Sequence, residues 1–306
     1  MKKKKLLLTI VCNIIAWILS LICLVPLVLI IFNSLKDSLS ASYMNLSLPA
    51  FPIPWDNFST VIQKGKLDTS FLNSAIYSVG SVALCTLFAA AAAYVLSRNR
   101  TKLNSFLYIF IVLGITMPMN YVALIRVMSF LNLMNSQIGI ILLYAGMQLP
   151  FAVFLIHGFV AKVPVDLDEA GIIDGCSPIR LFFSIVLPLL KPALATVIVL
   201  TFLNTWNEFA SPLYFLNSSE KWPMTLSVYN FFGMYFKDWN LVCADILLTS
   251  LPVILVYLLG QKYIVSGMTA GAVKGKVSYE SDHLSIGGGE SGSLSRQRKL
   301  SSASLF

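Results

Sequence analysis

Long continuous runs of apolar residues, separated by short polar segments, dominate this chain. The first run follows four lysines at the amino terminus and extends to about Phe32. Five further runs cover about Phe71–Leu96, Phe106–Met128, Ile138–Phe159, Leu189–Leu213 and Val242–Ile264. Each run is long enough to cross about 30 Å of hydrocarbon as a helix, whereas a membrane β-barrel needs short alternating segments. The pattern therefore predicts an all-α integral membrane protein with six transmembrane helices.

The composition supports a membrane environment. Hydrophobic residues make up 57% of the chain, charged residues only 12%, and the mean hydropathy is +0.78. A soluble domain carries about a quarter charged residues. The net charge of +8 does not indicate nucleic-acid binding, because the basic residues lie between apolar runs and form no stripe with aromatic residues.

The distribution of the basic residues predicts the orientation. If the amino terminus is cytoplasmic, sixteen of the 22 Lys and Arg residues fall on the cytoplasmic side. Cytoplasmic segments normally carry the excess of Lys and Arg, so we expect both termini in the cytoplasm. The first run has about 23 residues and lacks a small-x-small cleavage site, which favours a retained helix over a signal peptide.

The polar segments divide the chain into three parts. Residues 1–70 are expected to hold the first transmembrane helix and an outer loop, and residues 71–276 a five-helix core with a cytoplasmic loop at 160–188. Residues 277–306 include nine serines and four glycines. Such a composition cannot bury a core, so we expect a disordered tail.

The loop at 160–188 has the local chemistry of two short helices. Asp166 can cap the first helix, with Glu169 three residues later as in a capping box. Gly175 can adopt the left-handed conformation that ends a helix. Ser177 can cap a second helix, in which Pro178 occupies the first position, where its missing N–H costs nothing. These residues predict a compact helix-turn-helix outside the bilayer, with a shape that fits the cleft of a partner.

The loop resembles that of the permease subunits of binding-protein-dependent ABC importers. Their loop carries Glu-Ala-Ala, three residues, Gly, nine residues, Ile, one residue and Leu-Pro, and every spacing fits here. The matching region contributes a candidate ATPase-coupling set of Glu169, Ala170, Gly171, Asp174, Gly175, Ile185, Leu187 and Pro188. This chain departs from the pattern at Gly171, which replaces the second alanine. Glycine weakens a helix by about 1 kcal/mol relative to alanine.

The resemblance extends from about residue 57 to residue 275 and is greatest to the maltose-type carbohydrate permeases. Phe71-Leu-Asn-Ser74, the segment from Leu203 to Phe209 and the segment from Met268 to Gly275 carry it. It implies a bacterial inner-membrane complex that contains two permease subunits, expected to be different, two ATPase subunits and an external sugar-binding protein. The chain has no Gly-x-x-x-x-Gly-Lys-Ser/Thr loop. We therefore expect no enzyme and no bound cofactor, with ATP used by a partner subunit.

Polar residues in two spans are candidates for the substrate path. In the fifth span, a stripe of Thr201, Asn204, Asn207, Glu208 and Ser211 shares one face at helical spacing. Amides and a carboxylate suit a ligand rich in hydroxyl groups, and an ionisable residue within a membrane usually serves function. Contact between helices, or solvation of Glu208 at the outer end, explains the stripe equally well. Tyr144 and Gln148 share a face of the fourth span and can line the same path, although a satisfied internal hydrogen bond explains them slightly better.

Other classes of protein fit the sequence less well. A secondary active transporter of small polar solutes, the alternative function, would show inverted repeats and several buried charges, but Glu208 is the one strong candidate. A membrane enzyme would need a cluster of His, Asp or Glu. The five cysteines form no CxxC pair and the two histidines are isolated, so no catalytic or metal site is expected.

Overall fold

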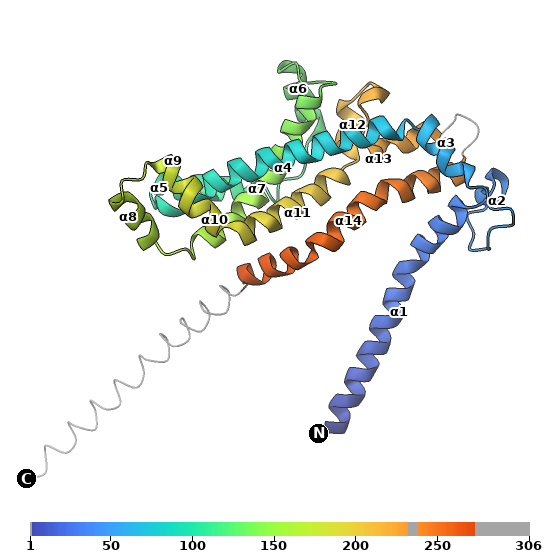
Figure 1. Cartoon of the computed structure of the whole chain (residues 1–306), viewed down its shortest axis with the longest axis horizontal. Helices are drawn as coiled ribbons and strands as arrows, with labels where there is room; N and C mark the ends of the chain where they lie inside the picture. Colours follow the sequence, from blue (N-terminus) through green and yellow to red (C-terminus); the bar gives the residue numbers. More distant parts are fainter. Residues whose placement is uncertain (1, 232–237, 273–306) are drawn as a thin grey trace, which may run out of the picture. The chain divides into compact units, whose positions relative to one another are not determined.

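The computed structural model describes residues 2–231 and 238–272, with side chains described for 9–231 and 238–264. Within these ranges the secondary structure is entirely helical (Figure 1). The longest helices are α1 (Lys2–Ser34), α4 (Leu67–Arg98), α7 (Gln137–Val160) and α14 (Trp239–Ala272). The all-α membrane fold is thus confirmed. The predicted tail at 277–306 lies outside the described residues.

Shorter helices connect the long ones. Two lie between α1 and α4, namely α2 (Ser38–Ser42) and α3 (Asp56–Lys64). Between α11 (Lys191–Trp206) and α14 lie α12 (Ala210–Phe215), the 3₁₀ turns Ser219–Lys221 and Val228–Phe231, and α13 (Met224–Ser227). The order of the helices can be followed in Figure 1.

The expected count of six continuous spans is not reached. Among the described residues, four helices are long and apolar enough to cross a membrane, and a fifth span results if the bent pair Pro178–Leu189 and Lys191–Trp206 is counted as one. Two of the expected spans are interrupted, each near a proline.

The expected span Phe106–Met128 consists of two helices, α5 (Lys102–Leu113) and α6 (Tyr121–Phe130). Between them lies Pro118, which has no N–H to donate and disfavours helical backbone at the preceding residue. The side chain of Asn120 then caps α6 by accepting a backbone N–H bond. The interruption therefore has a local cause.

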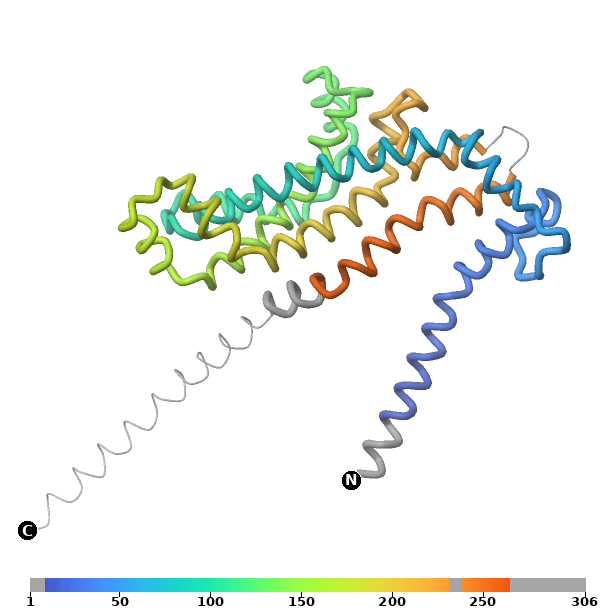
Figure 2. The backbone as a smooth tube through the Cα atoms, viewed as in Figure 1, coloured from blue at the N-terminus to red at the C-terminus, as the bar shows by residue number. Residues whose placement is uncertain are grey.

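The expected span Leu189–Leu213 is also interrupted. Its main helix, α11 (Lys191–Trp206), ends seven residues early, and α12 follows at Ala210. A continuous helix would need Pro212 to donate an N–H bond to the carbonyl of Glu208, four residues earlier, which proline cannot do. At its other end α11 follows α10 (Leu187–Leu189), and the segment Pro178–Leu189 makes a bend of 79° with α11; the course of the backbone can be followed in Figure 2.

The chain folds into two compact units. The first comprises the residues up to 87, 116–149 and 198–259, and the second comprises 88–115, 150–197 and the residues from 260. The first unit contains two buried clusters. One comprises Val61, Leu67, Trp206, Met224, Phe231, Val242 and Ala244, and the other comprises Tyr77, Met128, Ile140, Tyr144, Phe215 and Leu216.

The second unit packs through small residues. Ala89, Ala90 and Ala93 on α4 are completely buried. Small side chains let membrane helices approach closely, and they gain van der Waals contact where apolar burial gives little. A methyl group at Gly114 would lie 3.0 Å from the ring of Pro150, so glycine permits close contact there as well.

A buried lysine joins the end of α1 to the loop that follows. The Nζ atom of Lys36 donates to the side chain of Asn33 at 3.2 Å, and to the backbone and side-chain oxygens of Asn45 at 2.9 and 2.8 Å. Asn57 donates to the carbonyl oxygen of Lys36 at 2.9 Å. Burial lowers the pKa of Lys36, because the charged amine loses its hydration.

Candidate functional site

The loop between α7 and α11 folds as the predicted helix-turn-helix. Its first helix, α8, runs from Asp166 to Ile173. The prediction that Asp166 caps this helix is wrong: the cap position is Val165, which has helical backbone angles and makes no side-chain cap bond. The chain turns one residue earlier than expected, because the N–H groups of Asp168 and Glu169 already donate to the carbonyl of Val165. Asp166 therefore lies in the first turn, where the helix dipole favours a negative charge.

The turn after α8 has the predicted glycine geometry. Gly175 has a φ of +78°, in the left-handed region. The N–H of Cys176 donates to Gly171 O and that of Gly175 donates to Ile172 O, both at 3.0 Å, which is a complete Schellman motif. Nothing lies within 4 Å of the position that a Cβ atom would take at Gly175. Glycine is thus favoured here by backbone conformation alone.

The second helix begins as expected. The side chain of Ser177 accepts from the N–H of Arg180, and Pro178 opens α9 (Pro178–Leu181). A π-helical turn, Phe182–Val186, then leads into α10. Such turns are rare and occur frequently at functional sites.

Gly171 lies close to side chains of the second helix and of the π-helical turn. A Cβ atom at this position would lie 2.5 Å from Leu181 Cδ1 and 2.9 Å from Ile185 Cδ1. An alanine at this position would therefore make the ends of the Leu181 and Ile185 side chains shift. Ile185 is half-buried.

The opposite face of the helix pair is exposed and apolar. Ile172, Ile173 and Ile179 are 63%, 85% and 73% exposed. Leu187 of the candidate coupling set is half-buried. The exposed members of the set are Glu169, Ala170, Asp174, Gly175 and Pro188. Exposed apolar side chains that lie together are candidates for contact with another protein.

The polar stripe of the fifth span does not lie on one helical face. Because α11 ends at Trp206, Asn207 and Glu208 belong to the connecting turn and Ser211 to α12. Thr201 and Ser211 are buried, whereas Asn204 and Asn207 are exposed. The stripe is therefore divided, and only part of it is available to a ligand.

Two of the predicted path residues meet directly. The amide nitrogen of Asn204 donates to Gln148 Oε1 at 2.9 Å, joining α11 to α7. Asn204 remains exposed and Gln148 half-buried, so the pair keeps free hydrogen-bonding capacity. One turn away on α7, the hydroxyl of Tyr144 is buried and has no hydrogen-bond partner within the described residues.

Glu208 stabilises the break between α11 and α12. Its Oε1 atom accepts from the N–H of Ser211 at 2.9 Å and from the hydroxyl of Ser211 at 3.0 Å. Its carbonyl oxygen, which Pro212 leaves without a helical partner, accepts from the hydroxyl of Thr225 at 3.0 Å. The sequence suggested this carboxylate for the substrate path but gave no sign of its bonds to Ser211.

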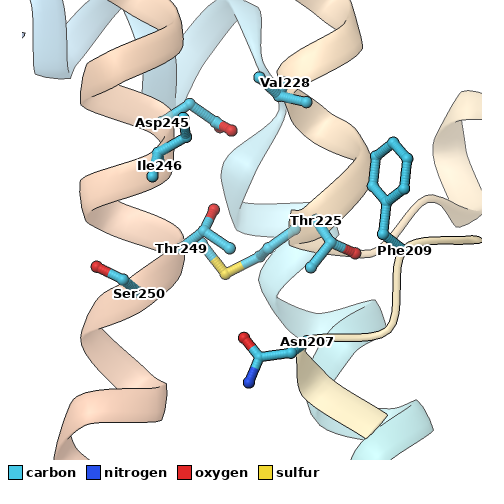
Figure 3. Close-up of a pocket in the computed structure, with 9 residues that line it drawn as sticks. Asn207, Phe209, Thr225, Val228, Asp245, Ile246, Thr249 and Ser250 are labelled. Carbon is cyan, nitrogen blue, oxygen red and sulfur yellow. The ribbon is translucent and has the colours of Figure 1, made fainter. Parts of the chain in front are cut away.

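A cavity of about 310 Å³ lies beside this break (Figure 3). Asn207 and Phe209 contribute from the connecting turn, Thr225 from α13, and Asp245, Thr249 and Ser250 from α14. Asp245 is buried and accepts from the hydroxyl of Ser227 at 2.7 Å. Asp245 is not among the path residues that the sequence suggested, because the cavity forms from three segments distant in the chain.

No metal centre is visible in the part of the chain that the structure describes. No three His, Cys, Asp or Glu side chains there lie close enough together to hold an ion.

Comparison with known proteins identifies the family. Residues 84–270 match the family described as binding-protein-dependent transport system inner membrane component. The chain belongs to this family. It is therefore a multi-pass membrane permease of an ABC-type transport system rather than an enzyme, as the resemblance of its loop implied.

Curated relatives extend this similarity over most of the chain. A probable starch degradation products transport system permease protein, AmyC of Thermoanaerobacterium thermosulfurigenes, is 33% identical, with 84% of this chain and 94% of the relative covered. The multiple sugar-binding transport system permease protein MsmG of Streptococcus mutans is 35% identical, and the match covers 82% of this chain and 92% of that relative. The melibiose/raffinose/stachyose import permease protein MelC of Bacillus subtilis is 32% identical, and the match covers 82% of this chain and 91% of that relative.

A solved structure shares the fold. It is a bacterial ABC transporter involved in the import of the acidic polysaccharide alginate, and one of its chains superimposes with a TM-score of 0.74. The superposition covers 84% of this chain and 96% of that one, at 23% identity. The fold of the described helices is therefore that of an ABC importer subunit.

Proposed function

We propose that the chain is one of two permease subunits that form the membrane path of an ATP-driven carbohydrate importer. The observation that carries this proposal is the helix pair α8–α9, which offers an exposed apolar face around Glu169 to a partner protein. Carbohydrate is favoured as the substrate class because three relatives, each at least 32% identical, are sugar or starch-product permeases by name.

The energy for transport must come from a separate subunit. The sequence contains no phosphate-binding loop of the Gly-x-x-x-x-Gly-Lys-Ser/Thr type, so ATP hydrolysis belongs to a partner. Each of two ATPase subunits would bind one permease through the α8–α9 face. Ile173, which is 85% exposed, would be buried on binding and contribute most through its apolar side chain.

The charge distribution favours one orientation. Sixteen of the 22 Lys and Arg residues lie on one side if the chain crosses as predicted. This side would be the cytoplasm of a bacterial cell, with both termini and the α8–α9 pair facing the ATPase. An external sugar-binding protein would deliver the substrate to the opposite side. The second permease is expected to be a different chain.

The polar groups of the first unit fit a path for a hydroxylated ligand. The pair Asn204–Gln148 offers amide donors and acceptors at an exposed position. Sugar hydroxyl groups both donate and accept hydrogen bonds, so they match such amides better than a charged pair would. Glu208 and Ser211 would shape the wall by holding the break between α11 and α12. Asn207 would reach substrate from the cavity in Figure 3.

Co-purification tests the partner surface. The chain is expressed together with a candidate second permease and a candidate ATPase subunit, and the retained ATPase is quantified. Ile173→Asp should reduce ATPase retention, because it places a charge in the apolar face. Asn99→Asp adds the same charge at another exposed position and serves as the control. Undiminished retention in Ile173→Asp would contradict the docking role.

A binding assay tests the substrate class. The external binding protein that works with this permease is incubated with radiolabelled maltose, melibiose and raffinose. Retention of one of these sugars supports a carbohydrate importer, whereas retention of none of them would argue against the proposed substrate class.

A further inference from the structure

An ion pair ties the first helix of the loop to the end of a long helix. The Nε atom of Arg98, the last residue of α4, lies 2.6 Å from Asp168 Oδ2 on α8. The same guanidinium donates through Nη1 to the carbonyl oxygen of Val163 at 3.0 Å. Arg98 therefore holds both the chain that enters α8 and the first turn of α8. All three residues belong to the second unit.

This pair is better shielded from water than a surface salt bridge. The side chains of Arg98 and Asp168 are 13% and 9% exposed. An exposed pair contributes little, but removing one partner of a buried pair leaves an uncompensated charge, which is strongly destabilising. Arginine suits this position because its rigid fork of donors can reach a carboxylate and a carbonyl at once.

A second contact joins α4 to the same loop. The ring of Tyr94, one turn before Arg98, lies 5.5 Å from the ring of Phe182 between centroids. Phe182 opens the π-helical turn on which Gly171 packs. The end of α4 thus contacts both halves of the loop, while the isoleucine face stays exposed.

We propose that the Arg98–Asp168 pair is a clamp that makes α4 move with α8, so that a displacement imposed on the loop by the ATPase reaches the membrane. The proposal rests on the coupling role proposed above. It makes Arg98 a positioning residue that contacts neither substrate nor ATP. Because α4 is one helix from Leu67 to Arg98, a shift at its end is passed along its length. Without the clamp, the ATPase can move α8 while α4 stays behind.

The test compares variants in the complete importer, reconstituted with its partner subunits and binding protein. Arg98→Gln and Asp168→Asn each remove one charge, and Arg100→Gln at an exposed neighbouring position is the control. Two quantities are measured: ATP hydrolysis, and uptake of radiolabelled maltose or raffinose per ATP hydrolysed. We expect each single variant to hydrolyse ATP while uptake per ATP falls about tenfold. Arg100→Gln should behave like the unchanged complex.

The double variant Arg98→Gln, Asp168→Asn separates a clamp from independent effects. Because it leaves no unpaired charge, it should assemble at least as well as Arg98→Gln yet remain uncoupled, and its loss should be smaller than the two single losses combined. Unchanged uptake per ATP in the single variants would overturn the proposal. So would reduced assembly with normal uptake per ATP, since that result indicates a structural role only.

A readout independent of sugar keeps the two proposals distinct. Hydrogen exchange of the α8 amides in the purified complex should be about tenfold faster in Arg98→Gln than in Arg100→Gln. Equal exchange would count against the clamp even if no sugar is transported. Failure of the unchanged complex to take up sugar would instead count against the proposed function.

Discussion

The backbone of Gly175 allows a sharp prediction, because its cost can be assigned to conformation alone. The residue has a φ of +78°, and no atom lies within 4 Å of the position that an alanine methyl group would occupy. Gly175→Ala therefore loses no contact and creates no clash. It must place an L side chain in the left-handed region, at a cost of about 1–2 kcal/mol. Gly175→Asn should cost clearly less, because asparagine tolerates this region.

Hydrogen exchange measures this cost directly. The N–H of Cys176 closes the Schellman motif by donating to Gly171 O. A cost of about 1–2 kcal/mol raises the open population about 5–30-fold, so this amide should exchange faster by the same factor in Gly175→Ala. Gly175→Asn is the matched control, and Gly175→Val should exceed the alanine variant because a branched side chain fits this region least. Equal exchange in the alanine and asparagine variants would refute the reasoning, and so would unchanged exchange in both.

Three further predictions concern other sites. Gly171→Ala should destabilise the complex by at most about 2 kcal/mol in thermal unfolding, because an overpacking cost of about 1–3 kcal/mol is partly offset by about 1 kcal/mol of helix propensity. A larger loss of stability, or a gain in stability, would contradict this balance. Asn204→Ala and Glu208→Gln should each lower sugar uptake or change the preferred sugar. The yield of the complex should persist, since one hydrogen bond between membrane helices averages about 0.6 kcal/mol. Unchanged uptake and unchanged sugar preference in the double variant would show that these residues do not line the path. Because the pKa of Lys36 is lowered, the folded chain releases this proton at a lower pH than the unfolded chain does, and the stability contributed by this group should rise as the pH approaches 10.5. Lys36→Met should abolish that rise, and a rise that persists in the variant would assign it to another group.

Local chemistry explains which parts of the loop could be predicted. Gly175 ends α8 and Ser177 with Pro178 begins α9, as the sequence indicated, because each residue acts on backbone groups within a few positions. The Asp166 cap failed because Val165 already has helical backbone. Proline does not locate breaks by itself: Pro150 lies inside the continuous helix α7.

Contacts between distant segments could not be read from the sequence. Arg98 and Val163 are 65 positions apart, and no local rule brings them together. The cavity beside Asn207 likewise needs α13 and α14 to pack against the turn after α11. The division of the polar stripe had a visible signal in Pro212, whose missing N–H frees the carbonyl of Glu208, but the donor that satisfies it, Thr225, comes from a later helix.

The most direct test of the account is sugar uptake by the complete complex in sealed vesicles, with the binding protein outside and the ATPase subunits on the side where ATP is supplied. The account predicts that radiolabelled sugar accumulates only when ATP is present, and that a protonophore leaves this accumulation intact. Uptake that proceeds without ATP and collapses with the proton gradient would instead establish a secondary transporter and contradict the central claim.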